Sequence, residues 1–156
     1  MHPNAQTIKD FYDCFAKRDA EGMIAHYDPQ VEFSDPVFPA LRGEEVFGMW
    51  RMLTARAKDF HLEASGIEAD DTTGRAHWDA HYLFTKTGRK VLNQIDATFT
   101  FRDGKIVRHR DSFDLWKWTR MALGVPGYLL GWAPPLQAKV RKQAADGLRE
   151  FMKKRG

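Results

Sequence analysis

A carboxylate lies in line with apolar residues in the segment VEFSDPVF, residues 31–38. Strand side chains alternate between two faces, so an expected strand here has Val31 and Phe33 on one face and Asp35 next on that face. An unpaired carboxylate is costly to bury, so it becomes protonated, finds a partner or lines a wet cavity. The sequence therefore marks Asp35 as a candidate for chemistry.

A second polar pair is expected to face inward on the strand at 105–114. His109 and Asp111 share one face of this strand, and Arg108 and Arg110 share the other. Because arginine is almost never fully buried without a partner, the arginine face must be the outer one. His109 and Asp111 then point into the interior, toward Asp35.

This set of groups suits acid and base chemistry. Burial in an apolar pocket raises the pKa of a carboxyl group toward neutral, and a base of that strength can take a proton from carbon beside a carbonyl. We expect Asp35 to act as general base, with Asp111 and His109 as acid and base partners. Two other interpretations stay open, namely ligand binding without turnover and a buried polar cluster with a purely structural role.

The elements that must position these groups follow from periodicity. A first helix is expected after Asn4, a second after Asp19, and a third along the apolar stripe from Val46 to Ala57. After Lys58 the pattern alternates with period two, and turns such as DDTTG and RDGK favour hairpins. Helices followed by a run of antiparallel strands indicate an α+β domain with helices on one face of a curved sheet. The strands are expected near residues 60–69, 75–86, 90–101 and 105–114.

Aromatic side chains dominate the faces taken as inner, and they are expected to shape a ligand pocket around the polar groups. The expected lining combines these faces with apolar positions of the helices and the first strand. The candidate ligand-binding residues are Phe11, Tyr12, Phe15, Tyr27, Phe33, Phe38, Trp50, Trp78, Tyr82, Asn93, Phe99 and Phe113.

Size and composition favour one globular domain. The chain has 156 residues, of which 43% are hydrophobic and 13% aromatic, enough for a sizeable apolar core. No apolar run reaches the ~20 residues that span a bilayer, and the N-terminus lacks a secretion signal. With Cys14 as the single cysteine no internal disulfide can form, so we expect a cytoplasmic protein.

The C-terminal part differs in charge from the rest. Residues 117–156 carry nine Lys and Arg against two acidic residues, a net charge of +7, so the first 116 residues carry −4 of the total of +3. We expect a cone domain over 1–116 and a basic amphipathic helical extension over 117–156, with a helix from about Pro135. Its apolar segment GVPGYLLGW is either a lid or belt over the pocket or a dimer partner, or an interfacial membrane contact. The charges follow no nucleic-acid reading motif, so no nucleic acid partner is expected.

Metal and cofactor sites are not expected. His77, Asp79 and His81 alternate on one strand face with a spacing that could hold zinc, but that face is the expected outer one. We interpret these three residues as a solvated or dimer-interface patch rather than a zinc site. The sequence has no glycine-rich phosphate loop, cysteine pair or Gly-x-Ser-x-Gly elbow.

Two stretches carry a resemblance to a known superfamily. The chain resembles the nuclear transport factor 2-like superfamily, closest to its SnoaL-like and ketosteroid isomerase-like branches. The two stretches are FYDCFAKRDAEGMIAHYDPQVEFSDPVFPALRG, which is followed by a helix, and FTFRDGKIVRHRDSFDLW. The resemblance covers residues 5–116. It implies a cone-shaped α+β barrel, a deep apolar pocket and a homodimer, which we expect to form through the outer sheet face.

Family roles transfer only in part. The DP of FSDPVF matches the proton-shuttling aspartate of ketosteroid isomerases, which implies that role for Asp35. Those enzymes use a tyrosine on the first helix as oxyanion donor, where this chain has Phe11 with Tyr12 beside it. Their second donor is a protonated aspartate, where this chain has Ala97, and Asp96 faces the other way. Classical steroid isomerisation is therefore disfavoured.

Two other branches give a clearer comparison. SnoaL-type polyketide cyclases keep an inward acid/base aspartate on the last strand, which matches Asp111, whereas limonene epoxide hydrolases need an inward arginine that this sequence lacks. The resemblance implies a protein that binds a steroid-, polyketide- or terpenoid-like ligand and carries out cofactor-free proton transfer of the isomerase or cyclase type, or a hydrolysis. The alternative is a non-catalytic ligand-binding or dimeric assembly module.

Overall fold

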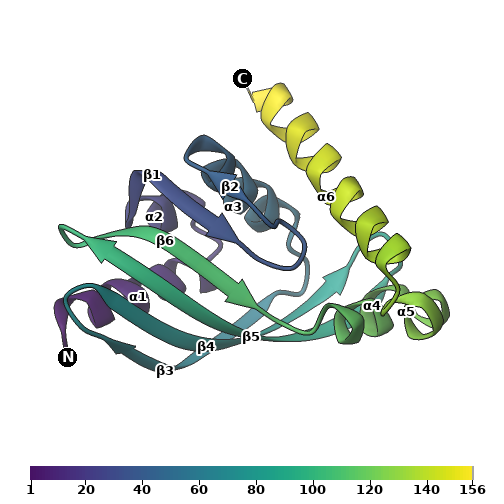
Figure 1. The fold of residues 1–156 in the computed structure, drawn as a ribbon, viewed down its shortest axis with the longest axis horizontal. Helices are drawn as coiled ribbons and strands as arrows, with labels where there is room; N and C mark the ends of the chain where they lie inside the picture. The colour runs from purple at the N-terminus through teal and green to yellow at the C-terminus, as the bar shows by residue number, and fades with distance from the viewer. Residues whose placement is uncertain (156) are drawn as a thin grey trace.

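Three N-terminal helices, one curved sheet and three C-terminal helices make up the structure, a computed structural model that describes residues 1–155 (Figure 1). The expected α+β class is confirmed. The helices are α1 (Pro3–Ala16), α2 (Ala20–Ile24), α3 (Glu44–Arg56), α4 (Leu115–Leu123), α5 (Val125–Leu130) and α6 (Pro134–Arg155). The strands are β1 (Tyr27–Ser34), β2 (Leu41–Arg42), β3 (His61–Ala69), β4 (Thr73–Phe84), β5 (Arg89–Arg102) and β6 (Lys105–Ser112).

The sheet is mixed and open. Its strand order is β2-β1-β6-β5-β4-β3, and every pairing is antiparallel except that of β1 with β6. Because β2 and β3 form separate edges, the sheet does not close into the barrel that the resemblance implies. The parallel pairing sets β1, from the first part of the chain, beside the last strand. It thereby brings the segment around Asp35 close to His109 and Asp111.

Local signals in the sequence explain where most elements begin and end. Asp19 caps α2, as expected, with its carboxylate accepting a hydrogen bond from the amide of Gly22 at 3.0 Å. The β5–β6 hairpin turns through Asp103 and Gly104, both at positive φ, which glycine adopts without strain.

The start of α1 differs from the expectation. His2 is the cap, and its Nδ1 accepts a hydrogen bond from the amide of Asn4. Pro3 fits the first helical position, where no amide hydrogen is needed, so the helix begins before Asn4. The side chain of Asn4 instead donates to the backbone of Asp70 and Asp71, which ties α1 to the β3–β4 turn.

The core fills the space between the N-terminal helices and the concave face of the sheet. Phe11, at 0% exposure, contacts the rings of Tyr12, Tyr27, Trp50 and Phe99. Burial of this aromatic set supplies much of the driving force for folding. The other large apolar residues of this core are Ile8, Phe15, Met23, Val31, Phe33, Phe38, Val46, Phe47, Met49, Met52, Leu62, Trp78, Ile95, Phe101, Ile106 and Leu148.

The extension packs on the same domain. Figure 1 shows α6 beside α3, where Met152 lies so close to Gly48 that a Cβ there would be 2.7 Å from its side chain. Leu148 is 4% exposed, and Arg141 donates to the carbonyl oxygen of Pro36 at 2.8 Å. The expected helical extension is therefore present. No helix within residues 1–155 is long and apolar enough to cross a membrane.

Candidate functional site

Four buried side chains form a continuous hydrogen-bonded chain across the core. Trp50 Nε1 lies 2.8 Å from the hydroxyl of Tyr27, which lies 2.8 Å from His109 Nδ1, and His109 Nε2 lies 2.8 Å from Asp111 Oδ1. His109 is 1% exposed and Asp111 4%, so both face inward as the sequence predicts. Arg108 and Arg110 are exposed on the opposite face, as expected.

The chemistry of the donors gives this chain a direction. An indole N–H can only donate, so Trp50 donates to the Tyr27 oxygen. In the tautomer with the imidazole proton on Nε2, the Tyr27 O–H donates to Nδ1 of His109 and Nε2 donates to Asp111 Oδ1. This hydrogen-bonded chain, here called the relay, consists of Trp50, Tyr27, His109 and Asp111. The relay fixes the orientation of the imidazole and occupies one carboxylate oxygen of Asp111.

Asp35 lies in a turn after the strand rather than on it. β1 ends at Ser34, and the Asp35 Oδ1 accepts hydrogen bonds from the amides of Val37 at 2.7 Å and Phe38 at 2.5 Å. The amide of Asp35 in turn donates to the carbonyl oxygen of Phe38. The expected strand over 31–38 is thus shifted toward the N-terminus, because Pro36 has no amide hydrogen for a ladder and an aspartate can close a turn on itself.

One open pocket of about 440 Å³ is bordered by both Asp35 and Asp111. The turn brings Asp35 to the end of β6, so the two carboxyl groups meet here although they come from distant parts of the sequence. The remaining lining residues are Ser34, Pro36, Pro39, Arg110, Ser112 and Phe113.

The pKa of Asp35 is raised to about 7, mainly by burial. The hydrogen bond from the Phe38 amide lowers it, the negative charge of Asp111 raises it, and the Val37 amide lowers it again. Near neutral pH, Asp35 is therefore divided between its protonated and ionised forms. It can accept a proton and return it under the same conditions.

Two tyrosines lie within electrostatic range of these carboxyl groups. Burial raises the pKa of Tyr12 well above its usual value, and the charge of Asp111 raises it further. Burial also raises the pKa of Tyr82 to about 12, against a hydrogen bond from Trp118 that lowers it, with a smaller increase from the charge of Asp35. Both phenols are therefore neutral donors at neutral pH.

Three buried side-chain donors have no hydrogen-bond partner among the described residues; one is Nε of Arg120 on α4, and the other two lie in the core. The two in the core are the hydroxyl of Tyr12 and Nε1 of Trp78, whose rings lie 5.9 Å apart. A buried donor without a partner is costly, so each of these two is a position where a ligand oxygen would be stabilised.

The expected ligand-binding residues fall into two groups. Phe113 borders the pocket at Asp35, and Phe33 borders another pocket beside β2. The others pack in the core or against it, so their aromatic rings support the polar groups from behind. These are Phe11, Tyr12, Phe15, Tyr27, Phe38, Trp50, Trp78, Tyr82 and Phe99, with Asn93 buried on β5 at 7% exposure.

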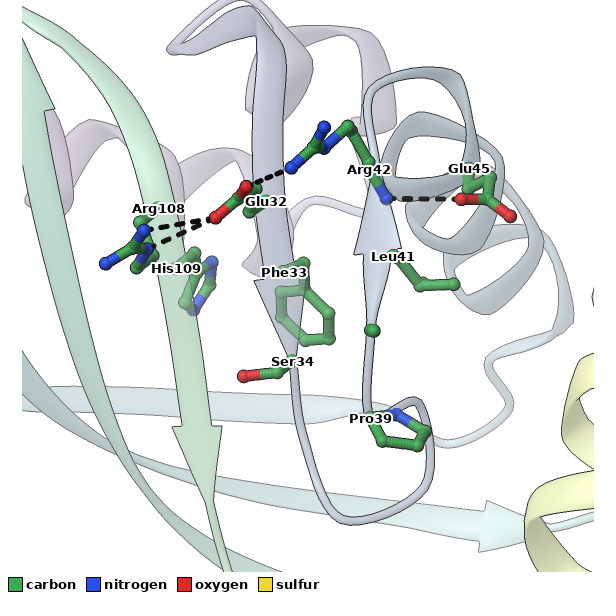
Figure 2. A pocket seen from close by; sticks show the side chains of 10 residues that line it. Glu32, Phe33, Ser34, Pro39, Leu41, Arg42, Glu45, Arg108 and His109 are labelled. Carbon is green, nitrogen blue, oxygen red and sulfur yellow. Dashed lines mark hydrogen bonds and ion pairs between the residues drawn. The ribbon is translucent and has the colours of Figure 1, made fainter.

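Figure 2 shows a second pocket, of about 450 Å³, beside β2. Glu32 is half-buried here and forms ion pairs with Arg42 and Arg108. Hydrogen bonds from Arg42, then Arg108, lower the pKa of Glu32. Phe33 and His109 also border this pocket, but its two carboxylates lie at the rim, where Glu32 is paired with both arginines and Glu45 accepts the Arg42 amide. It is a weaker candidate for base chemistry than the pocket at Asp35.

Residues that the sequence reasoning missed include Ser34, Arg110 and Ser112, which border the pocket at Asp35. Alternation places all three on an outer face of their strands. The turn after Ser34 brings the ends of β1 and β6, where these residues lie, to the pocket. The role of Trp50 as donor to Tyr27 was also missed, since indole nitrogens leave no periodic signal.

The outer face of the sheet holds an exposed cluster. His77 contacts Asp96 at 2.9 Å and Asp79 at 2.8 Å, whereas His81 lies beside His61 on the neighbouring strand. Within residues 1–155 no group of three or more His, Cys, Asp or Glu side chains is arranged to hold a metal ion. The homodimer expected through this face stays a prediction, as does the cytoplasmic location.

Comparison with known proteins agrees with this architecture. A family model described as a SnoaL-like domain matches residues 8–109, which include Asp35 and His109 and stop just before Asp111. No curated protein sequence matches the chain.

Solved structures of the same fold share little sequence with the chain. A nuclear transport factor 2-like protein of unknown function from Burkholderia pseudomallei has a TM-score of 0.68 at 20% identity, covering 78% of this chain and 98% of its own. A putative polyketide cyclase from Xanthomonas campestris has a TM-score of 0.65 at 20% identity, covering 77% and 96%. An epoxide hydrolase-like protein from M. tuberculosis has a TM-score of 0.66 at 17% identity, covering 82% and 96%. At these identities the likeness establishes the fold alone.

Proposed function

Because the chain belongs to the SnoaL-like domain family, whose fold hosts several chemistries, we propose a function from its own site. The protein binds a small, largely hydrophobic carbonyl compound at the pocket bordered by Asp35 and Asp111 and moves a proton on it without a cofactor. The observation that carries this proposal is geometric: the half-buried Asp35, whose pKa is raised to about 7, borders the same pocket as the buried Asp111.

The proposed step is proton abstraction beside a carbonyl. The ionised Asp35 takes the proton through Oδ2, since Oδ1 accepts the amides of Val37 and Phe38. The C–H bond breaks, an O–H bond forms on Asp35, and the electron pair moves onto the carbonyl oxygen as an enolate. Return of the proton to another carbon gives an isomer. Alternatively, the enolate carbon attacks a second carbonyl, the new C–C bond closes a ring, and the resulting alkoxide takes the proton back from Asp35.

Tyr12 does not border the pocket, and it is the proposed donor to the enolate oxygen of a ligand that reaches past Asp111 into the core. Its hydroxyl is buried and has no partner among the described side chains, so a ligand oxygen would satisfy it. Trp78 Nε1 offers a second donor of the same kind. Donors that are already in place when charge develops stabilise the transition state strongly, because no reorganisation is needed.

The relay holds the Asp111 carboxyl group in place. His109 donates to Asp111 Oδ1, and Tyr27 and Trp50 fix the imidazole from behind. Burial is the main cause of the raised pKa of Asp35, and the charge of Asp111 raises it further, which preserves its strength as a base. In this proposal Asp111 tunes Asp35 and can receive a proton through its second oxygen.

Ring closure or isomerisation fits the site better than epoxide hydrolysis. One relative in structure is described as a putative polyketide cyclase and another as an epoxide hydrolase. Epoxide opening of the kind considered above needs an arginine between the two aspartates. Arg110 borders the pocket, but its side chain is exposed. Ligand binding without turnover is the second candidate, favoured by the close aromatic packing of the concave face.

Hydrogen exchange in D₂O tests the proposal. A panel of hydrophobic enones, ketones and lactones is incubated with the full chain, and NMR follows deuterium entry at the carbon beside the carbonyl. Asp35→Asn should slow exchange by about 10²- to 10⁴-fold. Tryptophan fluorescence should show an affinity within about threefold of wild type, because the uncharged amide keeps the turn and the pocket shape.

Asp96→Asn is the matched control, since Asp96 is an exposed carboxylate on the outer face of β5. It should leave exchange unchanged. Exchange that survives both Asp35→Asn and Asp111→Asn would contradict the proposal. Binding without exchange in the wild-type protein would instead establish the second candidate.

A further inference from the structure

The segment from Val125 to Trp132, here called the α5 tip, presents large apolar side chains to solvent. It lies at one end of the molecule, beyond α4 (Figure 1). Isolated exposed apolar residues are common, but a cluster of this kind marks an interaction surface. The exposed fractions are 71% for Val125, 62% for Tyr128, 61% for Leu129, 55% for Leu130 and 62% for Trp132.

The α5 tip is held in this orientation by its small residues. A Cβ on Gly127 would lie 1.9 Å from the carbonyl oxygen of Thr119, and one on Gly131 would lie 1.9 Å from Thr119 Oγ1. These glycines therefore face α4 in close contact, which turns the large side chains of α5 away from the protein. Trp116 on α4 also donates from Nε1 to the carbonyl oxygen of Tyr128.

Two arginines lie beside the α5 tip, and the flanking sequence is basic. The guanidinium of Arg120 lies 4.5 Å from the ring centre of Trp116, and Arg89 lies under Gly124, where it donates to the carbonyl oxygen of Met121. Between residues 115 and 145 the sequence has no Asp or Glu. The same stretch contains Lys117, Arg120, Lys139, Arg141 and Lys142.

We propose that the α5 tip docks on the surface of an anionic phospholipid bilayer, with Leu129, Leu130 and Trp132 entering the headgroup region. Tyr and Trp favour the membrane–water interface, and flanking Lys and Arg are attracted to anionic lipids. A second copy of the chain is a poorer occupant, because two α5 tips meeting face to face would bring the same positive charges together. The inference is independent of the proposed chemistry.

Sedimentation with vesicles tests this docking on the full chain. Vesicles of phosphatidylcholine alone are compared with vesicles of phosphatidylcholine and phosphatidylglycerol in equal amounts. The wild-type protein should sediment with the second kind and be released by high salt. Leu129→Ser combined with Trp132→Ser should lower the partition coefficient at least about tenfold. These side chains are solvent-exposed, so the fold should be retained, which circular dichroism checks.

Leu53→Ser is the matched control, since Leu53 is 39% exposed on α3, away from the α5 tip. It should bind vesicles like wild type. Brominated lipids should quench tryptophan emission in wild type and much less in Trp132→Phe.

Three results would overturn the proposal. The first is no wild-type binding to anionic vesicles, and the second is equal binding by the double variant. The third is lipid-free dimerisation that the double variant abolishes, without vesicle binding, which would assign the α5 tip to a second copy of the chain.

Discussion

The hydroxyl of Tyr27 lies 2.8 Å from Nδ1 of His109, and this contact joins the start of β1 to the middle of β6. The two strands pair in parallel, so the hydrogen bond links the first and last parts of the sheet through its interior. It leaves Nε2 of His109 for Asp111 and thereby determines which atom of the imidazole supports the carboxylate.

Removing the Tyr27 hydroxyl should destabilise the protein. Tyr27→Phe leaves Trp50 Nε1 and His109 Nδ1 buried without their partner, which should lower the free energy of unfolding by about 1–3 kcal/mol. Tyr128→Phe removes an exposed hydroxyl and should change it by less than about 0.5 kcal/mol. Urea unfolding measures both, and equal effects would show that the relay has no energetic weight.

The stability of the protein should fall as the pH rises through the range in which Asp35 titrates. The pKa of Asp35 is about 7 in the folded state against 3.8 for the free group, so the folded state binds more protons between these values. The contribution of Asp35 is complete below about pH 4 and is lost as the pH rises toward 7, on the order of a few kcal/mol.

Asp35→Asn isolates this effect, because the amide oxygen can still close the turn but does not titrate. Relative to wild type, the variant should gain stability steadily as the pH is raised, as measured by urea unfolding at several pH values. Parallel curves for the two proteins would mean that Asp35 has an ordinary pKa.

The docking of α6 on α3 should make Gly48 intolerant of a side chain. Leucine is a better helix former than glycine and would stabilise a free helix, but at Gly48 it would meet Met152. Gly48→Leu should therefore lower the free energy of unfolding by about 1–3 kcal/mol. Gly147→Ala has room, since the nearest atom, on Arg56, is 3.9 Å away, and should raise it by up to about 1 kcal/mol. Stabilisation by Gly48→Leu in thermal unfolding would contradict the packing.

His77 should titrate above its usual pKa of 6.5. The hydrogen bond to Asp96 is the largest cause and that to Asp79 the next, so Asp96→Asn should lower the pKa more than Asp79→Asn does. The stabilisation from His77 is complete below pH 6.5 and is lost as the pH rises through the higher, folded-state pKa. NMR titration of the imidazole measures this, and the reverse order of the two variants would contradict the geometry.

Much of the fold could be predicted because short-range rules govern it. The two arginines flanking His109 indicate which face of β6 is buried, and the burial of His109 and Asp111 confirms this. The Asp103–Gly104 turn and the Asp19 cap follow from the chemistry of single residues.

The details around Asp35 could not be read from alternation. Alternation assumes that the strand continues through Asp35, whereas Pro36 and the side chain of Asp35 end it at Ser34. The carboxyl group still reaches Asp111, but from a turn. The parallel pairing of β1 with β6 depends on contacts between distant parts of the chain, which no local pattern specifies.

The α5 tip shows a different limit. The sequence GVPGYLLGW is apolar enough to suggest a covered turn or lid. Its orientation depends on the contacts of Gly127 and Gly131 with Thr119, which bury the small residues and expose the large ones. Composition cannot distinguish these two orientations.

The most direct test of the site is the pKa of Asp35, measured by carboxyl ¹³C NMR in wild type and in Asp111→Asn. The central claim is that two carboxyl groups meet in one poorly solvated pocket. It predicts a pKa of about 7 in wild type and a lower one in Asp111→Asn, still above 3.8 because burial is the larger cause. A wild-type value near 3.8, unchanged in the variant, would contradict it.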